Sequence, residues 1–593
     1  MIKSAIAAIN LTIQAWSEQK SLIQKAIYEA KEAQVELLVF PELVIGGPDA
    51  QDLYLRSDTY EKSEAILAEI ASMTFGMTVV LGAPVNHKGK YYNTAAVFHD
   101  GCLKALVPKR YANHHADEHR YFDAWDFSQP HELHAGASFG ALNVELPGFE
   151  KLCIIWGDPS VQPIPEAGSI CVEIAARPYA YDEFTFTLQD RIELSKACQI
   201  TWLAANLLGS DDGTHVYDGG GYILHQGHIL ALAPRFVFDR DVVVTTSEDK
   251  PCAGFDPTLA HIKAAQQLKT AEDHIQLELE LALCLALHDY TRRSGIRKLC
   301  LALSGGRDSA MVAMIAAHLI QYLYSEADEE TRREKVREFL LTAYLPSQAS
   351  STSATREAAV KLAEHYGFDC HIIPIADLAH QTLQTVETTL GRQLTWETDD
   401  LTLQNVQARM RSSIIWTLAN AHHAMLLTTG NQSEAAVGYT TMDGDSSGCL
   451  DPIGNIPKTL VSQWLEWARN YYNIPALDLV FAQPPSAELR PSQTHQADEK
   501  DLMPYPLLDA LITWYCFERR PADALFELAK AKCHAFCPDD DLLIKYIQKF
   551  LTMLPRAQWK RLRLANSFMV LPHNLSADQG YRMPCLMTSD KLS

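Results

Sequence analysis

KLCLALSGGRDSAMVAMIAAHLI, residues 298–320, decides the fold of the second half of this 593-residue chain. The apolar run before Ser304 predicts a buried β-strand, and the apolar residues that recur after Ser309 predict a helix. In the intervening SGGRDS, glycines let the backbone approach an anion closely, and the helix start offers unpaired N–H groups and a favourable dipole. The stretch therefore predicts a phosphate-binding loop, with a simple glycine-rich turn and an Asp or Ser helix cap as the alternative.

The loop lacks the Lys of a Walker A motif, so it is not typical of P-loop nucleoside triphosphatases. SGGxDS after a strand instead resembles the PP-loop of ATP pyrophosphatases, which cleave ATP between the α and β phosphates to adenylylate a substrate. Further motifs follow in order: YLPSQASSTSATREAAVKLAEHYG, LQNVQARMRSSIIWTLAN, MLLTTGNQSEAAVGYTTMDGDSSGCLDPIGNIPKT, QPPSAELRPSQ and DEKDLMPYPLLDAL. The series resembles NAD+ synthetase over essentially residues 270–590, and TTGNQSEAAVGY is far more specific than the loop alone.

This resemblance implies a Rossmann-like parallel-sheet domain of the PP-loop (adenine nucleotide α-hydrolase-like) type. It also implies a ligase that adenylylates and amidates nicotinic acid adenine dinucleotide (deamido-NAD+), with ATP as co-substrate. Because two polyanions must meet, cations have to offset their repulsion, and Mg2+ prefers carboxylate oxygens. By resemblance, Asp308 and Glu434 hold the Mg2+ ions.

The resemblance assigns further residues by their positions in the motifs, and catalysis of this kind is mostly positioning and electrostatic stabilisation. The residues assigned to ATP are Ser304, Gly305, Gly306, Asp308, Ser309 and Thr429. Those assigned to the transfer step are Lys458, Ser486 and Asp308, and those near the deamido-dinucleotide are Asn405, Arg411 and Asp445. Taken singly, each could be a surface or capping residue. The chain departs from many relatives at Gln483, where they have Lys, and at Asn455, where they have Asp.

The first half of the chain is rich in strand-like segments with few helices between them, which favours large sheets packed on each other with helices outside. The expected strands are residues 4–13, 35–43, 77–85, 91–107, 151–158, 169–176, 200–209 and 220–236, and residues 21–34 read as an amphipathic helix. A polar stretch with Pro and Gly follows, and a long helix is expected at roughly 259–294. We place the domains at 1–245 and 271–593, with a linker at 246–270.

A buried strand ends at Glu42 in LLVFPEL, and a strand-end carboxylate in an apolar setting is a reasonable general base. Lys109 lies in VPKRYANHHADEHRYF, with Glu118 and Arg120 downstream. With NLLGSDDGTHVYDGGGYILHQGHILALAPRF, these motifs resemble the nitrilase-like carbon–nitrogen hydrolase domain of glutamine-dependent NAD+ synthetases, an αββα sandwich. In that family a Glu base, a Lys and a Cys nucleophile release ammonia from glutamine.

Alignment of KLCIIWGDPSV on Asp158 puts Trp156 at the position of the Cys nucleophile and Gly157 at that of the Glu that follows it. Cys153 lies three residues upstream, which is about 10 Å along an extended strand, and the odd spacing turns it to the opposite face. Removal of such a nucleophile costs on the order of 10⁶-fold in rate. The sequence therefore predicts a degenerate amidase site at Glu42, Lys109 and Trp156, and a synthetase that uses free ammonia.

The composition suits a globular enzyme, with 47% hydrophobic and 21% charged residues. The net charge of −22 argues against a nucleic-acid partner. The 13 cysteines have no framework spacing, the N-terminus lacks signal-peptide features, and no uncharged apolar run is long enough to span a membrane. We expect a cytoplasmic protein with no membrane partner, and the resemblance implies a homo-oligomer formed through the amidase domains.

Two alternative functions stay open on the sequence. One keeps the PP-loop chemistry but changes the carboxylate or the amine, so that the chain is an amide ligase for another substrate. The other makes the chain a non-catalytic nucleotide-binding regulatory or scaffold protein. Retention of both predicted metal carboxylates, Lys458 and the loop argues against the second alternative.

Overall fold

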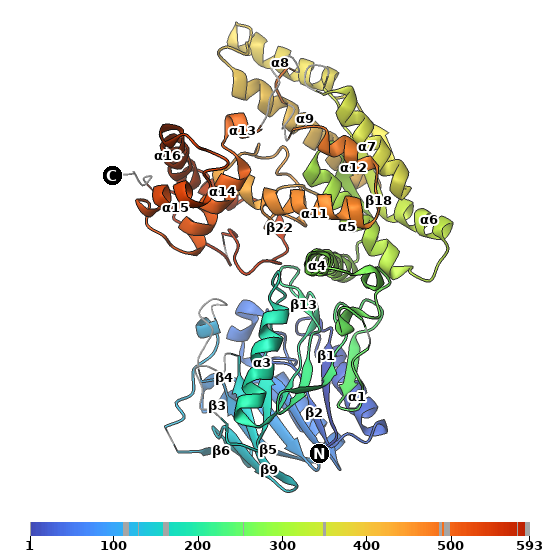
Figure 1. Ribbon diagram of the computed structural model, residues 1–593, viewed down its shortest axis with the longest axis vertical. Coiled ribbons are helices and arrows are strands. Elements are labelled where there is room, and N and C mark those ends of the chain that lie inside the picture. The colour runs from blue at the N-terminus through green and yellow to red at the C-terminus, as the bar shows by residue number, and fades with distance from the viewer. Residues whose placement is uncertain are drawn as a thin grey trace. The chain divides into compact units, whose positions relative to one another are not determined.

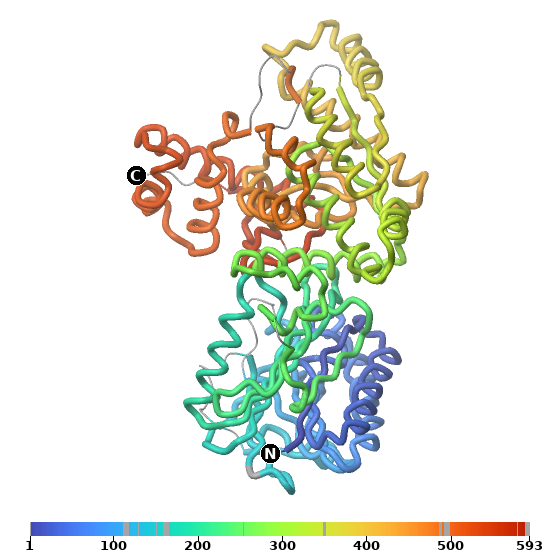
Figure 2. The backbone as a smooth tube through the Cα atoms, turned by 45° about the vertical axis from the view of Figure 1, so that its right-hand side comes forward, coloured from blue at the N-terminus to red at the C-terminus, as the bar shows by residue number. Residues whose placement is uncertain are grey.

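The computed structural model describes residues 2–110, 118–128, 130–157, 165–252, 254–347, 351–484, 489–491, 498–577 and 579–587. The chain divides into two compact units, residues 1–290 and 291–593 (Figure 1). The tube in Figure 2 traces the first unit from blue to green and the second from green to red. The domain boundary and linker expected from the sequence stay a prediction.

The first unit contains two large sheets in its described residues. The first sheet has the order β16-β1-β2-β3-β4-β5-β7-β6 and the second has the order β15-β14-β11-β10-β9-β8. The strands of the first are β1 Ser4–Ile9, β2 Leu37–Val39, β3 Thr78–His87, β4 Lys90–His99, β5 Cys102–Pro108, β6 Glu132–His134, β7 Ala137–Phe139 and β16 Val242–Thr246. Those of the second are β8 Asn143–Leu146, β9 Phe149–Trp156, β10 Ile170–Ile174, β11 Thr201–Ala204, β14 Tyr222–His225 and β15 His228–Leu232. A short ribbon, β12 Leu208–Gly209 with β13 Tyr217–Asp218, is separate.

Three apolar clusters arrange these sheets in four layers, as the sequence predicts. Val39 and Val97 of the first sheet cluster with Ile154 of the second, so the sheets pack face to face. Helix α1 (Trp16–Glu32) packs on the outer side of the first sheet through residues such as Ile23. Helix α3 (Phe184–Cys198) packs on the outer side of the second sheet, and α2 (Ser57–Ala71) joins the layer of α1. The expected αββα sandwich is therefore confirmed.

The long helix after the sandwich begins later than the sequence suggests. We expected it from about residue 259, but α4 spans Ala271–Ser294, and short 3-10 turns precede it. The Thr270 hydroxyl accepts a hydrogen bond from Asp273 N (3.0 Å), and the Asp273 carboxylate accepts one from Thr270 N (3.1 Å). This reciprocal capping box fixes the start of the helix.

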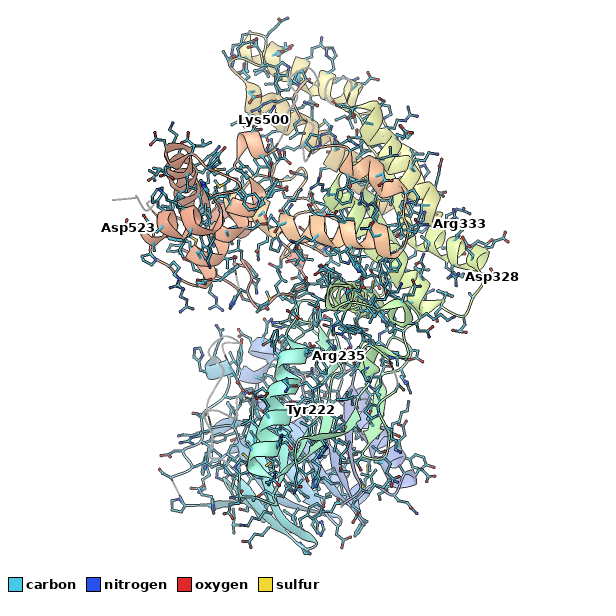
Figure 3. The ribbon with its side chains drawn as sticks, in the orientation of Figure 1. Tyr222, Arg235, Asp328, Arg333, Lys500 and Asp523 are labelled. Atoms are coloured by element: carbon cyan, nitrogen blue, oxygen red, sulfur yellow. The ribbon has the colours of Figure 1, made fainter. Side chains whose placement is uncertain are left out.

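Arg235 secures the first part of α4 to the sandwich. It is fully buried, donates to Asp218 Oδ2 (2.8 Å) and contacts Glu278 of α4. Its guanidinium lies 3.9 Å from the centre of the Phe184 ring, at the start of α3. Figure 3 labels Arg235 and Tyr222 beside α3. One buried cation thus compensates two buried carboxylates of the first unit.

The second unit is built on a parallel sheet of order β19-β18-β17-β20-β21-β22 in the described residues. Its strands are β17 Leu299–Ala302, β18 Leu340–Tyr344, β19 Asp369–Ile372, β20 Met425–Leu427, β21 Leu450–Asp451 and β22 Asn566–Ser567. The chain runs from β17 outward to β19, then returns to β20 on the other side of β17. Ligands of such sheets bind where the strand order reverses, at the carboxyl ends of the strands. This places the end of β17 and the end of β20 at the expected ligand site.

Helices surround this sheet. They are α5 Arg307–Leu323, α6 Glu329–Phe339, α7 Ser353–Tyr366, α8 Ala376–Leu390, α9 Asp400–Ala421, α10 Gln432–Val437, α11 Lys458–Tyr471, α12 Ala476–Phe481, α13 Asp498–Asp501, α14 Tyr505–Ile512, α15 Ala524–Lys532, α16 Asp540–Arg556 and α17 Gln558–Arg561. Ile415 of α9 clusters with Cys300 and Leu426 of the sheet, so α9 covers one face. Asp328 caps α6, and Arg333 of α6 donates to the carbonyls of Glu364 and His365 at the end of α7 (Figure 3).

Helices α14, α15 and α16 form a separate apolar cluster with α10, through residues such as Leu508, Leu525, Phe550 and Ala436. Figure 1 shows α14, α15 and α16 grouped together in the second unit. None of the helices in the described ranges is both long and apolar enough to cross a membrane.

Candidate functional site

The SGGRDS loop connects β17 to α5, as its sequence predicts. Gly305 has φ +82°, and a Cβ there would lie 2.1 Å from the carbonyl oxygen of Thr355, so only glycine fits. Ser304 Oγ accepts a hydrogen bond from Gly306 N (3.2 Å) and lies 3.0 Å from Ser309 Oγ. The two serine hydroxyls thus stabilise the turn at Gly305 and Gly306. Helix α5 begins directly after Gly306, at Arg307.

A single ammonium group joins two carboxylates beside this loop. Lys458, the first residue of α11, contacts Asp308 Oδ2 and donates from Nζ to Glu434 Oε1 (2.9 Å). Asp308 stands in the first turn of α5, and Glu434 in the first turn of α10. Asn431 caps α10 through Glu434 N (3.0 Å) and also donates from Nδ2 to Asp308 Oδ1 (3.3 Å). Three helix starts therefore converge on one cation.

Burial shapes the charges of this cluster. Burial raises the pKa of Asp308, although the Lys458 ammonium partly offsets the effect, and the Glu434 carboxylate raises that pKa further. Burial alone would lower the pKa of Lys458, but the carboxylates of Asp308 and Glu434 outweigh it and raise that pKa above its usual value. Tyr505 adds a hydroxyl that donates to Glu434 Oε1 (3.0 Å). With both carboxylates ionised, the cluster keeps one uncompensated negative charge, which favours a further cation.

The loop and the cluster open on a cavity of about 880 Å³ in the second unit. Most residues that the sequence assigns to the synthetase site line this cavity: Ser304, Gly305, Gly306, Asp308, Arg411, Thr429, Glu434, Asp445 and Lys458. Ser309 lies behind the loop, where it bonds Ser304. Ser486 lies outside the described residues.

The residues expected near the dinucleotide differ in position. Arg411 of α9 lines the cavity and donates from Nε to the carbonyl oxygen of Leu345 (3.0 Å). Asp445 also lines it, and burial raises the pKa of its carboxyl to about 6. Asn405 is not among the lining residues, but its side-chain oxygen accepts a hydrogen bond from Thr441 (2.9 Å). Thr441 does not line the cavity either, but its N donates to Asp445 Oδ1 (2.6 Å), so Asn405 is connected to the cavity only through Thr441 and Asp445.

The residues at the two family departures both line the cavity. Gln483 donates from Nε2 to the carbonyl oxygen of Leu479 (3.1 Å), and buried Asn455 donates from Nδ2 to Ser567 Oγ (2.8 Å). Both amide groups therefore form hydrogen bonds with neighbouring protein groups. Arg307, beside the loop, donates to Ser462 Oγ (3.0 Å).

Sequence reasoning missed two carboxylates, the buried Asp451 in the cavity wall and the half-buried Asp509 beside the cluster. Asp451 lines the cavity at the end of β21, and burial raises its pKa to about 7. Asp509 of α14 contacts Ser433 Oγ and accepts hydrogen bonds from Thr459 N (3.1 Å) and Thr459 Oγ1 (2.7 Å). It thus links the residue before Glu434 to the residue after Lys458. The signal available was the placement of both Asp residues inside the motifs CLDPIGNIPKT and YPLLDAL.

A second ion cluster lies in the first unit, at the ends of strands. Lys109 follows β5 and donates from Nζ to Glu42 Oε1 (2.6 Å) and Glu118 Oε2 (2.9 Å). Asn93 of β4 donates to the same two carboxylates, at 2.6 and 2.8 Å. Burial raises the pKa of Glu42, while the charges of Glu42 and Glu118 outweigh burial to raise that of Lys109. The structure thus brings Glu42 and Lys109 together, as expected.

Trp156 is the last residue of β9 and only 4% of its surface is exposed. The Lys109 ammonium lies over its ring, 5.9 Å from the ring centre. Trp156 packs between the two sheets, whereas Cys153 belongs to the cluster on the outer side, with Cys171 and Trp202. The predicted opposite orientation of Cys153 and Trp156 is therefore confirmed. Asp158, on which the alignment rests, lies outside the described residues.

Both halves of the chain match known protein families. Residues 280–533 match the family described as NAD synthase, and residues 5–162 match that described as carbon-nitrogen hydrolase. The glutamine-dependent NAD(+) synthetase of Aquifex aeolicus is 29% identical over 553 residues, covering 87% of this chain and 90% of that protein. The corresponding protein of Thermotoga maritima is 28% identical over 551 residues, covering 87% and 89%.

Two solved structures resemble this chain over almost its whole length. A crystal structure of a glutamine-dependent NAD(+) synthetase from Cytophaga hutchinsonii has a TM-score of 0.84 at 28% identity, covering 99% of this chain and 98% of that one. The glutamine-dependent NAD+ synthetase from Acinetobacter baumannii, in complex with ADP, has a TM-score of 0.66 at 22% identity, covers 98% of each chain, and is similar in fold. The chain therefore combines a nitrilase-like domain with an NAD synthetase PP-loop domain, as the sequence predicts.

Substitution of Gly305 tests the geometry of the loop. Gly305→Ala should weaken ATP binding at least about tenfold, because the new Cβ would collide with the Thr355 carbonyl and displace the turn. Gly391→Ala is the matched control, since Gly391 has φ +64° but no atom within 4 Å of a Cβ. Isothermal titration with ATP measures both. Equal affinities for the two variants would contradict the assigned role of the loop.

Substitution of Asp509 tests whether this residue holds α10 and α11 together. Asp509→Ala should lower the free energy of unfolding by about 1–3 kcal/mol, because the buried Ser433 hydroxyl and the half-buried Thr459 hydroxyl lose their acceptor. Asp509→Asn keeps one acceptor oxygen and should cost less. Urea unfolding followed by circular dichroism measures both variants. An alanine variant as stable as the wild type would show that Asp509 has no such role.

Proposed function

We propose that this chain is an NAD+ synthetase that activates the carboxylate of deamido-NAD+ with ATP and amidates it with free ammonia. The observation that carries the proposal is the convergence of Asp308, Glu434 and Lys458 beside the SGGRDS loop, on one cavity. This cavity lies in the half of the chain that matches the NAD synthase family. The likeness to glutamine-dependent NAD(+) synthetases over nearly the full length supports the same substrates.

The reaction proceeds in two displacements. A carboxylate oxygen of deamido-NAD+ forms a bond to the α-phosphorus of ATP, while the bond from that phosphorus to the pyrophosphate oxygen breaks. Ammonia then forms a bond to the carboxyl carbon, AMP leaves with the bridging oxygen, and a proton is lost from nitrogen. The SGGRDS backbone and the start of α5 suit the pyrophosphate, because N–H groups at a helix start bind anions. Lys458 supplies a positive charge beside the loop, where negative charge accumulates during transfer.

The cluster fits the Mg2+ that the resemblance implies. Asp308 and Glu434 lie close enough for a single cation, the Lys458 ammonium, to touch both, and carboxylate oxygens are the donors that Mg2+ prefers. When bound, the ion would neutralise the phosphate charges of ATP. Tyr505 donates to the same Glu434 oxygen as Lys458, and Asn431 donates to the second oxygen of Asp308, so both carboxylates are oriented by further hydrogen bonds.

The amine source follows from the first unit. Glu42 and Lys109 correspond to the base and the Lys of the family; Lys109 pairs with Glu42, and its ammonium lies over the ring of Trp156. Tryptophan offers no nucleophilic lone pair, and its side chain is packed between the sheets. Cys153 belongs to the cluster under α3, on the opposite side of β9. This arrangement supports a first domain that does not hydrolyse glutamine, with the Glu42–Lys109–Glu118 cluster kept as a buried ion network.

Other parts of the proposal rest on the resemblance. These are the role of Ser486, the assignments of Asn405, Arg411 and Asp445 to the dinucleotide, the cytoplasmic location, and assembly as a homo-oligomer through the first domain. A change of carboxylate substrate is the alternative within the same chemistry. Strict dependence of pyrophosphate release on deamido-NAD+ would reject it.

The amine source can be measured directly. With deamido-NAD+ and ATP, the wild type should form NAD+ with ammonium and form none above background with glutamine, since loss of such a nucleophile costs on the order of 10⁶-fold. Chromatography of the nucleotides measures both rates. Cys153→Ser is the control, and its rates should equal those of the wild type because Cys153 faces away from Lys109.

Trp156→Cys/Gly157→Glu extends this test by returning a thiol and a carboxylate to the positions that the alignment indicates. We expect this variant to gain glutamine hydrolysis while it keeps the ammonium-driven rate. Turnover of glutamine by the wild type that disappears in Cys153→Ser would contradict the account, because it would make Cys153 the nucleophile.

Lys458→Met tests the synthetase cluster. Removal of one positioned donor in a transfer site typically costs on the order of 10²–10³-fold in kcat, so NAD+ formation should fall by about that factor. Lys361→Met is the control, since Lys361 is an exposed residue of α7 that pairs with Glu364 at the surface. ATP–pyrophosphate exchange locates the loss in the first displacement. An unchanged exchange rate in Lys458→Met would contradict the role of Lys458 in adenylylation.

A further inference from the structure

A third cluster of charged side chains lies in the first unit, outside the Glu42–Lys109–Glu118 network. Asp49 belongs to the segment that follows Glu42, and Asp212 and His215 belong to the segment between β12 and β13. One ligand atom of each lies within 4.8 Å of the other two. None of these three residues has a part in the proposed reaction.

The atoms of this cluster have the spacing of a metal coordination shell. His215 Nδ1 lies 3.0 Å from Asp49 Oδ1 and 3.8 Å from Asp212 Oδ2. Metal–ligand distances of about 2.0–2.2 Å, as for zinc with nitrogen and carboxylate oxygen, put neighbouring ligand atoms roughly 3 to 3.5 Å apart. Small side-chain adjustments would bring all three atoms onto one ion.

In each of the two carboxylates, the oxygen that does not face His215 Nδ1 accepts hydrogen bonds that orient the side chain. Tyr217 donates its hydroxyl to Asp49 Oδ2 (2.8 Å), which leaves Asp49 Oδ1 toward His215. Asp212 Oδ1 accepts hydrogen bonds from Thr214 N (2.7 Å) and His215 N (2.9 Å). Such outer contacts orient metal ligands in known sites.

The second oxygen of Asp212, Oδ2, gives a separate indication that an ion binds here. The Asp212 side chain is only 7% exposed, and within the residues that the structure describes its Oδ2 atom has no hydrogen-bond partner. A buried carboxylate oxygen without a partner is costly. This oxygen is directed at the His215 ring, which is where a shared cation would sit.

A comparable cluster in the same unit shows the contrast. His274 Nε2 lies 2.7 Å from Asp256 Oδ2 and 3.2 Å from Glu278 Oε1. There the buried Arg235 guanidinium contacts Glu278 and lies 3.8 Å from Asp256 Oδ2, so a fixed cation already serves those carboxylates. Within the ranges that the structure describes, no Lys or Arg forms an ion pair with Asp49 or Asp212.

We propose that Asp49, Asp212 and His215 bind one divalent transition-metal ion, of which Zn2+ is the reference, through Oδ1, Oδ2 and Nδ1 respectively. Two carboxylates and an imidazole suit Zn2+, Mn2+ or Co2+ better than Mg2+, because the nitrogen donor disfavours the harder ion. The ion ties the segment that follows Glu42 to the segment that precedes β13. Three protein ligands leave a coordination position for water or for a ligand atom.

Metal content tests the proposal on the full-length protein. Protein treated with a chelator is incubated with a small excess of Zn2+, passed through a desalting column and analysed by mass spectrometry for zinc per chain. Asp308→Asn serves as the background, so that zinc at the synthetase carboxylates does not contribute. We expect about one zinc per chain in this background, and at least tenfold less retained zinc when His215→Gln is added.

Two further variants keep the test decisive. Asp212→Asn retains an acceptor oxygen for Thr214 N and His215 N but loses the ligand charge, so it should lose the zinc without unfolding. His274→Gln removes the histidine of the contrasting cluster and should retain the zinc. Co2+ in place of Zn2+ should give visible absorption bands that depend on His215. Absence of zinc from the Asp308→Asn background, or zinc unaffected by His215→Gln and Asp212→Asn, would overturn the proposal and leave a closed ion-pair network.

Discussion

The contact of one ammonium group with two buried carboxylates sets the arrangement of the second unit's site. Lys458 can touch both Asp308 and Glu434 only if the first turns of α5, α10 and α11 meet at one point. Like charges in a buried site repel, so the carboxylates are stable together only with a cation between them. The phosphate loop, the end of β20 and the cavity are positioned by the same convergence.

The first unit repeats this charge arrangement with a different outcome. Lys109 lies between Glu42 and Glu118 at the strand ends, much as Lys458 lies between its two carboxylates. Beside Lys458 stands a loop of glycines and serines that suits phosphate, whereas the group over which Lys109 lies is the indole of Trp156. An ion network of this kind stabilises only as long as every member stays paired. This gives Glu42 and Lys109 a structural role that does not require hydrolysis.

The sequence was sufficient to predict the structural features that depend on neighbouring residues along the chain. SGGRDS between an apolar strand and an apolar helix forms the expected loop, and the period of two along β9 separates Cys153 from Trp156. It missed what depends on packing between distant segments, such as the contact of Asp509 with the starts of α10 and α11. The helix start expected near residue 259 was too early, because the capping box at Thr270, which joins two residues in space, fixes the start of the helix.

We propose that the second unit makes NAD+ from ammonia while the first unit supplies none from glutamine. A mixture of 15N-ammonium and unlabelled glutamine, both saturating, offers the enzyme two nitrogen sources in one reaction with deamido-NAD+ and ATP. Mass spectrometry of the product reads the isotope of its carboxamide nitrogen. The account predicts NAD+ that carries 15N throughout. A substantial fraction of unlabelled NAD+, together with glutamate in equal amount, would contradict it.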